Sequence, residues 1–265
     1  MDKAPIEIRE CVVAASVGGR RLQGDLYLPQ RAVENGHPAV VLVYGGSWRS
    51  GEPSQQKVYG LALAKAGFVC LATEHRFSTA AQWPAQLEDV ATAVRWLRAH
   101  AKAFDIDSER IAISGNSSGG HLALMVTAAA ESLSSAQQEY WGEFSNRVSA
   151  VCAFYPPTQL SPLDAVNGDD TVRCLLGAEA TAADHDAASP LSFASQPWPP
   201  TLLLSGTADD RVPVEQTYQM HKALEAAGNT VELHTFAGQG HAFDGDREMA
   251  RVCAAILVNF FQRYV

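Results

Sequence analysis

Short apolar runs alternate with segments of helical periodicity along most of this chain. Residues 38–43, 68–73 and 201–204 are almost uninterrupted apolar stretches, which are typical of strands buried on both faces of a parallel sheet. Residues 87–101 instead place apolar side chains at helical spacing, and residues 214–227 form a second such segment that ends before a glycine. This alternation predicts an α/β fold with a mostly parallel sheet and helices on both faces.

The two ends of the chain fit the same architecture. Residues 6–14 and 21–28, separated by Gly18-Gly19, predict an antiparallel hairpin that precedes the parallel part of the sheet. At 265 residues and 47% hydrophobic, without an internal repeat or low-complexity linker, the chain is long enough for one large core, so we expect a single domain over 1–265. Further strands are predicted at 110–114, 148–154 and 231–236, with a final helix lined by Met249, Val252, Ile256 and Phe260.

Charge and cysteine content narrow the classes of partner. The formal charge of −9 and a pI near 5.3 argue against nucleic acid or an anionic membrane surface as partner. The first residues lack a basic segment followed by an apolar one, and no stretch is long enough to span a bilayer, so we expect a cytoplasmic protein. The five cysteines are odd in number and widely spaced, which favours reduced core thiols over disulfides or metal ligands.

Residues 115–119 carry the strongest chemical signal. They form a Gly-Asn-Ser-Ser-Gly sequence between an apolar run that ends at Ser114 and a helix-like run that begins at His121. A sharp strand-to-helix turn needs small residues on either side of its central serine, because neighbouring backbones pass very close to it. The pentapeptide alone is a weak signal, since glycine and serine are common. In this setting it predicts Ser117 as a nucleophile and the Ser118 amide as an oxyanion donor.

A serine hydroxyl needs a base and an acid that orients the base. Asp209 and Asp210 follow the predicted strand at 201–204. His241 follows the predicted strand at 231–236, between the glycines at 238 and 240 and the phenylalanine at 243. Open α/β sheets place their chemistry at these carboxyl ends of strands. His241 is therefore the predicted base, and one of the two aspartates is the acid. The other histidines are predicted inside the helix that follows the strand-to-helix turn at Ser117 (His121), inside a strand (His234), or in loops or on helix surfaces (His37, His75, His100, His185, His221).

A second oxyanion donor is predicted after the first buried strand. Residues 38–43 run directly into Gly45-Gly46-Ser47, and paired glycines let a backbone turn its amides inward. The amides of Gly46 or Ser47, next to Gly45, can complete an oxyanion hole with that of Ser118. An ordinary Gly-Gly turn is the alternative for this segment.

Taken together, these motifs resemble the α/β-hydrolase family, and within it the bacterial esterase/lipase group related to hormone-sensitive lipase and hemicellulose-associated acyl esterases. The likeness covers roughly residues 38–245. It departs from the family pattern at Tyr44, where the family has histidine before the glycine pair, and at Ser205, where histidine often precedes the glycine. It rests on residues 44–48, where the family has H-G-G-x-W, on 83–89, 93–97, 115–119 and 154–157, on 206–209 with Val212-Pro213, and on 240–243.

The resemblance implies a short cap over the active site. Helical and strand periodicity disappears between residues 156 and 200, in the place where relatives insert such a cap, and long irregular segments of compact domains are commonly binding loops or lids. We expect part of the acyl or alcohol pocket there. Trp198 is predicted as a wall, with Trp48 and Trp83 near the oxyanion side, although core packing explains a tryptophan equally well.

The implied function is a serine carboxylester hydrolase that works through an acyl-enzyme. Ser117 attacks, His241 transfers the proton and Asp209, favoured over Asp210 by the family spacing, holds the imidazole. Short acyl esters of small molecules, including acylated sugars, are the expected substrates, with neither a metal nor an organic cofactor. Oligomeric state is not predicted. Two alternatives stay open, namely an amide or formamide hydrolase with the same machinery and a non-catalytic binding protein on a hydrolase scaffold.

Overall fold

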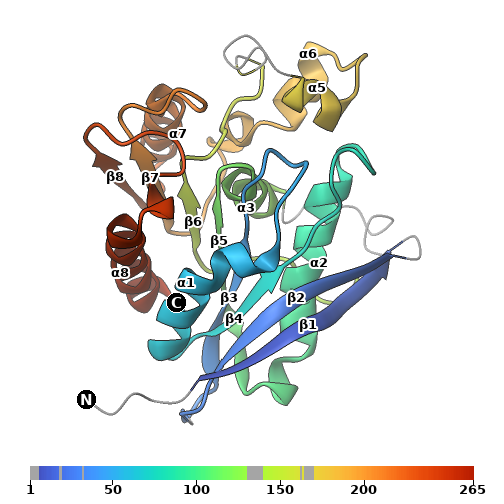
Figure 1. The fold of residues 1–265 in the computed structure, drawn as a ribbon, viewed down its shortest axis with the longest axis vertical. Coiled ribbons are helices and arrows are strands. Elements are labelled where there is room, and N and C mark those ends of the chain that lie inside the picture. Colours follow the sequence, from blue (N-terminus) through green and yellow to red (C-terminus); the bar gives the residue numbers. More distant parts are fainter. Residues whose placement is uncertain (1–5, 18–19, 32, 130–139, 162, 164–169) are drawn as a thin grey trace.

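A computed structural model describes residues 1–265 except 1–5, 18–19, 32, 130–139, 162 and 164–169. The described residues form one eight-stranded sheet that crosses the molecule (Figure 1). In spatial order its strands are β1 (Ile6–Val17), β2 (Arg20–Pro29), β4 (Val69–Thr73), β3 (His37–Val43), β5 (Ile106–Asn116), β6 (Val151–Phe154), β7 (Thr201–Gly206) and β8 (Val231–Phe236).

The sheet is antiparallel at one edge and parallel elsewhere. β1 pairs with β2 and β2 with β4 in antiparallel register, whereas β4, β3, β5, β6, β7 and β8 run parallel to one another. In the centre, Val41 lies opposite Leu71 on one side and Ile113 on the other. The predicted N-terminal hairpin and parallel sheet are therefore confirmed, and all parallel strands end at the same edge.

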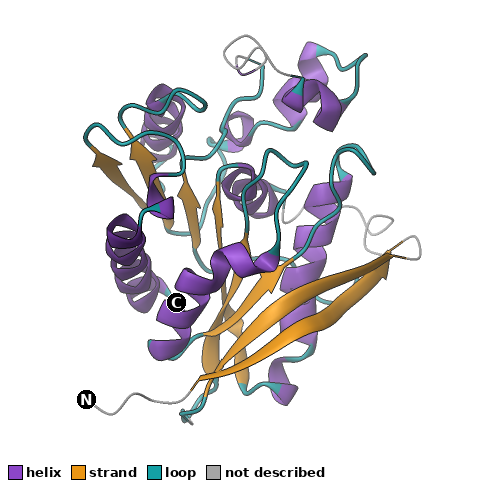
Figure 2. Cartoon of the chain, in the orientation of Figure 1, coloured by secondary structure: helices purple, strands orange, loops and turns teal. Residues whose placement is uncertain are grey.

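Helices cover both faces of the sheet (Figure 2). Side chains of β3 alternate between the two cores, with Val41 and Val43 in one and Val40 and Leu42 in the other, because successive strand residues point to opposite faces. The first core is shared with α2 (Ala85–Ala99), α3 (Ser118–Ala128) and α7 (Val214–Ala226), and the second with α1 (Lys57–Lys65) and α8 (Arg247–Tyr264). Short 3₁₀ turns lie at Pro53–Gln56, Ala101–Ala103, Pro190–Phe193 and Phe243–Gly245.

The described part of the segment without periodicity includes the short helices α5 (Thr171–Leu176) and α6 (Ala182–Ala187), which lie beyond the carboxyl ends of the strands (Figure 1). A six-residue helix completes fewer than two turns, so it leaves no repeating apolar pattern in the sequence. Part of the expected cap, including Val166, is outside the described residues. The described part of the segment predicted as a cap thus contains helical structure that the sequence pattern did not indicate.

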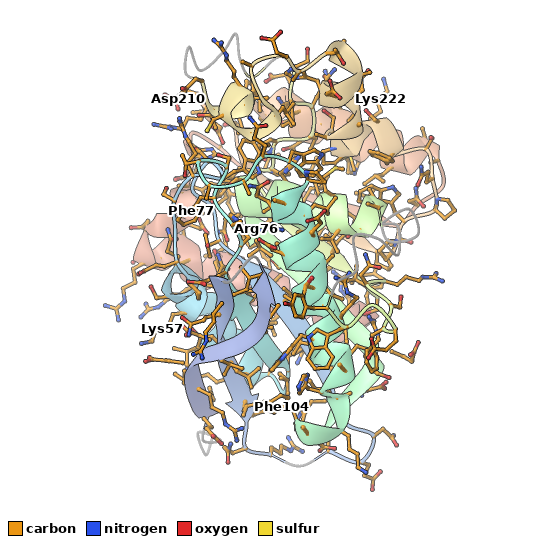
Figure 3. All side chains as sticks on the ribbon, turned by 90° about the vertical axis from the view of Figure 1, so that its right-hand side faces the viewer. Lys57, Arg76, Phe77, Phe104, Asp210 and Lys222 are labelled. Carbon is orange, nitrogen blue, oxygen red and sulfur yellow. The ribbon has the colours of Figure 1, made fainter. Side chains whose placement is uncertain are left out.

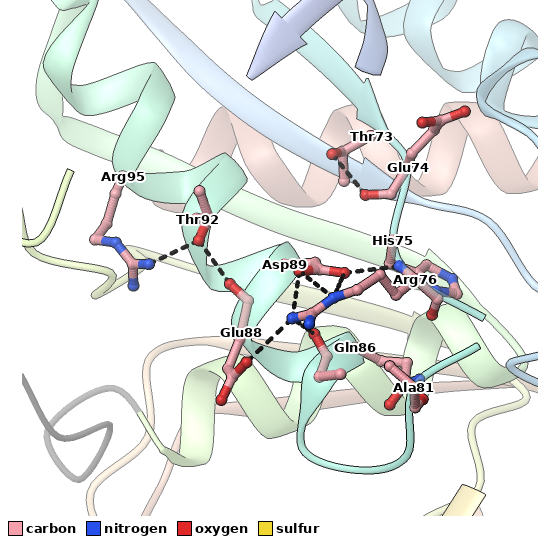
Figure 4. A network of polar contacts seen from close by, with 11 residues as sticks. Thr73, Glu74, His75, Arg76, Ala81, Gln86, Glu88, Asp89, Thr92 and Arg95 are labelled. Carbon is pink, nitrogen blue, oxygen red and sulfur yellow. Dashed lines mark hydrogen bonds and ion pairs between the residues drawn. The ribbon is translucent and has the colours of Figure 1, made fainter. Parts of the chain in front are cut away.

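An ion pair between the half-buried Arg76 and the buried Asp89 joins the amino-terminal part of α2 to the segment after β4 (Figure 4). The Asp89 carboxylate accepts hydrogen bonds from the Arg76 backbone N–H at 2.7 Å and from its side-chain Nε at 2.9 Å, and Glu88 pairs with the same guanidinium. Burial raises the pKa of the Asp89 carboxyl, and Arg76 opposes that shift. Ser78, two residues after Arg76, donates its N–H to the Trp48 carbonyl at 2.8 Å. The ion pair therefore fixes a segment that supports the loop after β3.

Two histidines are more buried than the pattern indicated. His37 opens β3 and bonds the Gly67 carbonyl through Nδ1 at 2.7 Å, and His75 stacks on Tyr44 with 4.8 Å between ring centroids. Both side chains are therefore buried inside the protein, where other parts of the chain provide their contacts, and do not lie on its surface.

Of the cysteines whose side chains are described, Cys70, Cys152 and Cys253 are buried, Cys174 is half-buried, and all are free thiols. Within the described ranges, every helix is too short or too polar to cross a membrane.

Candidate active site

Ser117 lies in a sharp turn between β5 and α3. Its backbone has φ 52° and ψ −123°, a conformation that costs a non-glycine residue steric strain. A Cβ atom on Gly115 would lie 2.3 Å from the Gly119 carbonyl oxygen, and one on Gly119 would lie 2.3 Å from that of Val43. Only glycine fits at both flanking positions, so the turn is the strand-to-helix elbow that the pentapeptide predicts.

Ser117, His241 and Asp209 form one series of hydrogen bonds. Ser117 Oγ lies 2.9 Å from His241 Nε2, and His241 Nδ1 lies 2.8 Å from Asp209 Oδ2. An ionised carboxylate only accepts, so Nδ1 carries the proton and Nε2 is left to accept from the serine hydroxyl. This arrangement can deprotonate Ser117 as it attacks an electrophile.

The acid is held rigidly and out of water. Asp209 Oδ1 accepts the backbone N–H groups of Arg211 at 2.9 Å and Val212 at 2.8 Å, while Oδ2 faces His241, and the side chain is 0% exposed. Asp210 is exposed (Figure 3). Of the two aspartates between which the sequence alone left a choice, the fold brings Asp209 to the imidazole.

Loops after two neighbouring strands bring the acid and the histidine together. A Cβ on Gly206, the last residue of β7, would lie 2.2 Å from the Gln239 carbonyl oxygen in the loop after β8. The Ala208 N–H donates to the same carbonyl at 2.9 Å. Because these loops touch through backbone atoms, Asp209 and His241 meet at the carboxyl edge of the sheet.

The loop after β3 carries a candidate oxyanion hole. Gly46 has φ 144° and its carbonyl accepts the N–H groups of Arg49 at 3.0 Å and Ser50 at 3.1 Å. Ser47 and Trp48 follow with φ 55° and 56°, both in the left-handed region. The loop also approaches the elbow, since a Cβ on Gly45 would lie 2.9 Å from the Asn116 carbonyl oxygen.

The second candidate donor belongs to α3. Ser118 is the first residue of this helix, so its N–H has no acceptor within the helix and lies at the positive end of the helix dipole. Ser47 and Ser118 both line the hollow beside Ser117. Of the four residues predicted for an oxyanion hole, the fold brings Ser47 and Ser118 to one hollow beside the nucleophile, and Gly45 and Gly46, with Ser47, line a second hollow that also contains Ser117.

Ser117 and His241 line two hollows. The smaller, of about 400 Å³ including its mouth, has polar and apolar walls in similar proportion. The larger, of about 1240 Å³, has mostly apolar walls with several polar side chains. Ser47 and Arg211 line both hollows. The smaller hollow is also lined by Trp48, Ser118, Pro157, Leu163, Thr171, Val172 and Val212, and the larger by Gln55, Val58, Tyr59, Tyr155, Asp244 and Ala250.

A polar network centred on the half-buried Asp244 lines the larger hollow and was not predicted from the sequence. The Asp244 carboxylate accepts the Tyr155 hydroxyl, the Tyr59 hydroxyl at 2.5 Å and the Asn116 amide N–H at 2.5 Å. Burial, followed by the charge of Asp244, raises the pKa of both tyrosine hydroxyls, so they remain neutral donors. Asn116 directly precedes Ser117, and the network therefore anchors the elbow. The motif at 154–157 drew attention to Tyr155, but no sequence signal paired it with Asp244.

The three predicted tryptophans occupy different places. Trp48 lines the smaller hollow although it is only 2% exposed, and Trp83 packs its ring against His121 with 5.6 Å between centroids. Trp198 was predicted as a pocket wall, and that prediction is wrong. It precedes β7 and so lies at the amino end of the strand, whereas Asp209 follows the carboxyl end. Its indole N–H donates to the Phe193 carbonyl at 2.9 Å.

No three His, Cys, Asp or Glu side chains of the described ranges gather in a way that could hold a metal ion. Asp209 and His241 are instead engaged with each other and with Ser117. Its geometry is that of a nucleophile, a base and an orienting acid beside two backbone donors, which is the set of groups needed for acyl transfer.

Comparisons with known proteins identify the family and the fold. The BD-FAE family model matches residues 24–224. Esterase LipC of Mycobacterium tuberculosis is 31% identical over 78% of this chain and 53% of its own length, so the chain spans about half the length of that relative. The solved structure of a thermophilic esterase from Thermogutta terrifontis, Est2 with butyrate bound, superposes with a TM-score of 0.83 at 27% identity, covering 98% of this chain and 94% of Est2. The α/β-hydrolase fold expected from the resemblance is confirmed.

Proposed function

The chain belongs to the BD-FAE family, and on that premise we propose that it is a serine carboxylesterase that hydrolyses short-acyl esters through an acyl-enzyme. The observation that carries the proposal is the series Ser117–His241–Asp209, with contacts of 2.9 and 2.8 Å. Similarity to LipC and Est2, which are named esterases, supports the choice of esters among the carbonyl substrates this machinery can attack.

In the acylation step, Ser117 Oγ attacks the ester carbonyl carbon while His241 Nε2 takes the hydroxyl proton. The carbonyl π electrons move onto oxygen, and the amides of Ser118 and of Ser47 or Gly46 stabilise the resulting oxyanion. When the intermediate collapses, the C–O bond to the alcohol breaks and His241 gives its proton to the departing alkoxide. Ser117 is left acylated.

Deacylation repeats the sequence with water as the nucleophile. His241 takes a proton from the water as the water oxygen attacks the acyl carbon, and the same amides hold the oxyanion. When this intermediate collapses, the bond between the acyl carbon and Ser117 Oγ breaks, the carboxylic acid leaves, and His241 returns the proton to Ser117 Oγ. Asp209 does not exchange protons in either step. It stabilises the imidazolium and keeps the proton of the neutral ring on Nδ1, which is necessary because only an unprotonated Nε2 can act as a base.

The two hollows suggest how an ester would bind. We assign the acyl group to the smaller hollow, because a volume of about 400 Å³ suits a short acyl chain and Trp48, Leu163 and Val172 give it apolar contacts. The alcohol then occupies the larger hollow, whose volume of about 1240 Å³ suits a bulkier group and where Gln55 and Asp244 offer polar contacts to a hydroxylated alcohol such as a sugar. Solved structures of Est2 hold butyrate and propionate, which supports a short acyl group.

A substrate and labelling experiment tests the proposal. We expect the purified protein to hydrolyse p-nitrophenyl acetate and butyrate, and a matched aryl formamide to react more slowly by at least tenfold. Paraoxon should stop the activity and add one diethylphosphoryl group to Ser117, as found by peptide mass spectrometry. Est2 structures with organophosphate adducts support this choice of probe. A faster formamide reaction would make the protein an amide hydrolase, and labelling of another serine would remove the mechanism.

A further inference from the structure

His121 lies one helical turn beyond the nucleophile. Its backbone N–H donates to the Ser117 carbonyl at 2.9 Å in the first turn of α3, and its side chain is fully buried. It touches neither the serine hydroxyl nor the base in the series described above. The proposed reaction therefore gives this buried histidine no part.

Both ring nitrogens of His121 are occupied by groups from other parts of the chain. The Trp48 indole N–H donates to Nδ1 at 3.2 Å, and the two rings meet edge to face with 5.1 Å between centroids. Nε2 lies 2.7 Å from the carbonyl oxygen of Ala188. The indole can only donate and the carbonyl can only accept, so the imidazole is neutral, with its proton on Nε2.

The partner at Nδ1 belongs to the oxyanion loop. Trp48 follows Ser47, and both residues have left-handed backbone conformations that side chains with a Cβ disfavour. Such a conformation persists only where the surroundings hold it. The Trp48 carbonyl is held by the Ser78 N–H at 2.8 Å, and its side chain is held by His121.

The partner at Nε2 belongs to the cap. Ala188 directly follows α6 and is fully buried, and the next residue, Ser189, accepts the N–H of Leu160 at 3.0 Å through its hydroxyl. A second link joins the same two regions, because Arg49 donates to Asp170 and to Thr171, each at 2.7 Å. The oxyanion loop is thus tied to the cap on both its buried and its outer side.

We propose that His121 is a positioning residue that sets the oxyanion loop against the helix of the nucleophile. α3 supplies one oxyanion donor directly, through the Ser118 amide, and holds the other indirectly, through His121 and Trp48. One helix thereby fixes the distance between both donors and Ser117. The inference rests on the proposed esterase function, since an oxyanion hole matters only if an oxyanion forms.

The polar side chain of His121 supports a positioning role, because an apolar side chain would fill the same space without requiring hydrogen-bond partners. A buried imidazole is tolerated only when both nitrogens are satisfied, and it then imposes a unique arrangement on its neighbours. Glutamine can reproduce both contacts, because its carbonyl can accept from Trp48 while its amide donates to Ala188. Leucine can reproduce neither.

The test compares His121→Leu, His121→Gln and Trp48→Phe with the parent enzyme. We expect His121→Leu and Trp48→Phe to lower kcat for p-nitrophenyl acetate about 10- to 100-fold, because a donor displaced by a fraction of an ångström stabilises the oxyanion poorly. For His121→Leu, at a position that lines neither hollow, KM should change less than about threefold, and binding of a trifluoromethyl ketone, which forms a hemiketal oxyanion on Ser117, should weaken by the same factor as kcat. His121→Gln should recover most of the loss in kcat. The double variant that carries both His121→Leu and Trp48→Phe should have a kcat no lower than that of the poorer single variant, because both changes break the same contact.

Matched controls separate positioning from general damage. His37→Gln removes another buried histidine bonded to a carbonyl, and Trp198→Phe removes another buried indole donor, both remote from Ser117. Neither control should change kcat by more than about twofold. The proposal is overturned if His121→Leu, folded by thermal melting, keeps full kcat and full ketone affinity, or if His121→Gln is as poor as His121→Leu. A parent enzyme that lacks esterase activity, or a Ser117→Ala enzyme that retains it, would instead refute the proposed function.

Discussion

The ring of Tyr155 meets the imidazole of His241 edge to face, with 4.7 Å between the ring centroids. Tyr155 has a left-handed backbone, and its hydroxyl is fixed by the Asp244 carboxylate, which also holds Asn116 beside the nucleophile. One carboxylate therefore supports both the base and the elbow. Asp209 orients the imidazole in its plane, whereas Tyr155 limits its tilt.

Tyr155→Phe tests the hydroxyl while keeping the ring. The variant leaves the half-buried Asp244 with one donor fewer, and we expect the free energy of unfolding to fall by about 1.5–3 kcal/mol, the usual contribution of a hydrogen bond to a charged group. Because the ring still packs on His241, kcat should fall less than about tenfold. Urea denaturation and ester kinetics measure the two effects. The control Tyr218→Phe, at an exposed position, should change neither the free energy of unfolding nor kcat. An equal loss of stability in Tyr218→Phe would show that the hydrogen bond from Tyr155 to Asp244 does not stabilise the protein.

Ser117→Ala should abolish the proposed nucleophile without unfolding the protein. Loss of the nucleophile in such a series lowers kcat by roughly three to six orders of magnitude. Circular dichroism and thermal melting check that the fold is kept, and the exposed Ser195→Ala serves as the matched control. Near-normal turnover by Ser117→Ala would place the chemistry elsewhere.

Asparagine substitutions at the adjacent residues Asp209 and Asp210 should differ strongly in their effect on kcat. Asp209→Asn should lower kcat on the order of 10⁴-fold, because an amide can donate to Nδ1 and so favour the tautomer whose Nε2 carries the proton. Asp210→Asn, at an exposed position, should retain kcat within about threefold. Steady-state kinetics of the pair decides between them. A severe loss in Asp210→Asn with a mild one in Asp209→Asn would contradict the geometry of the 2.8 Å contact.

Acyl length is predicted from the walls of the smaller hollow. With p-nitrophenyl esters, kcat/KM should peak between acetyl and butyryl and fall steeply beyond about eight carbons, since each methylene left unburied forfeits about 0.8 kcal/mol. Leu163 is buried at this wall, so Leu163→Ala should move the optimum toward longer acyl groups. Activity that rises through dodecanoyl esters and increases at a lipid interface would indicate a lipase with a mobile lid.

The buried His121 predicts a pH dependence of stability. Burial lowers its pKa to about 4, against an ordinary value of 6.5, and the Ala188 carbonyl opposes the shift. The unfolded chain therefore binds the proton first as pH falls, and the stability contributed by the neutral ring is present above about pH 6.5 and is lost progressively toward pH 4. A shift of this size corresponds to roughly 3 kcal/mol.

Urea denaturation of the parent and of His121→Gln at a series of pH values measures this contribution. Glutamine does not titrate, so the difference in unfolding free energy between the two proteins should shift in favour of the variant as pH falls from 6.5 to 4. A difference that stays constant across this range would show that His121 does not remain neutral in the folded state. His37→Gln provides the comparison for another buried histidine.

Local sequence determined those features whose cause is local. The elbow at Ser117 needs Gly115 and Gly119 because of backbone contacts within a few residues and with the preceding strand, and the strands β3, β4 and β7 follow from apolar runs that can be buried only inside a parallel sheet. His241 could be predicted because it follows a strand, and the carboxyl ends of parallel strands meet at one edge.

Tertiary structure decided what depends on the direction of a side chain or on distant partners. Asp209 and Asp210 are neighbours in sequence, and only the packing of the loops after β7 and β8 selects which one reaches His241. Trp198 failed as a pocket wall because it precedes its strand and lies at the opposite end of the sheet. The pairs Tyr155–Asp244 and Trp48–His121 are separated by 89 and 73 residues, and no periodic pattern connects such positions. Contacts of this kind exist only after the sheet has formed and brought its loops together.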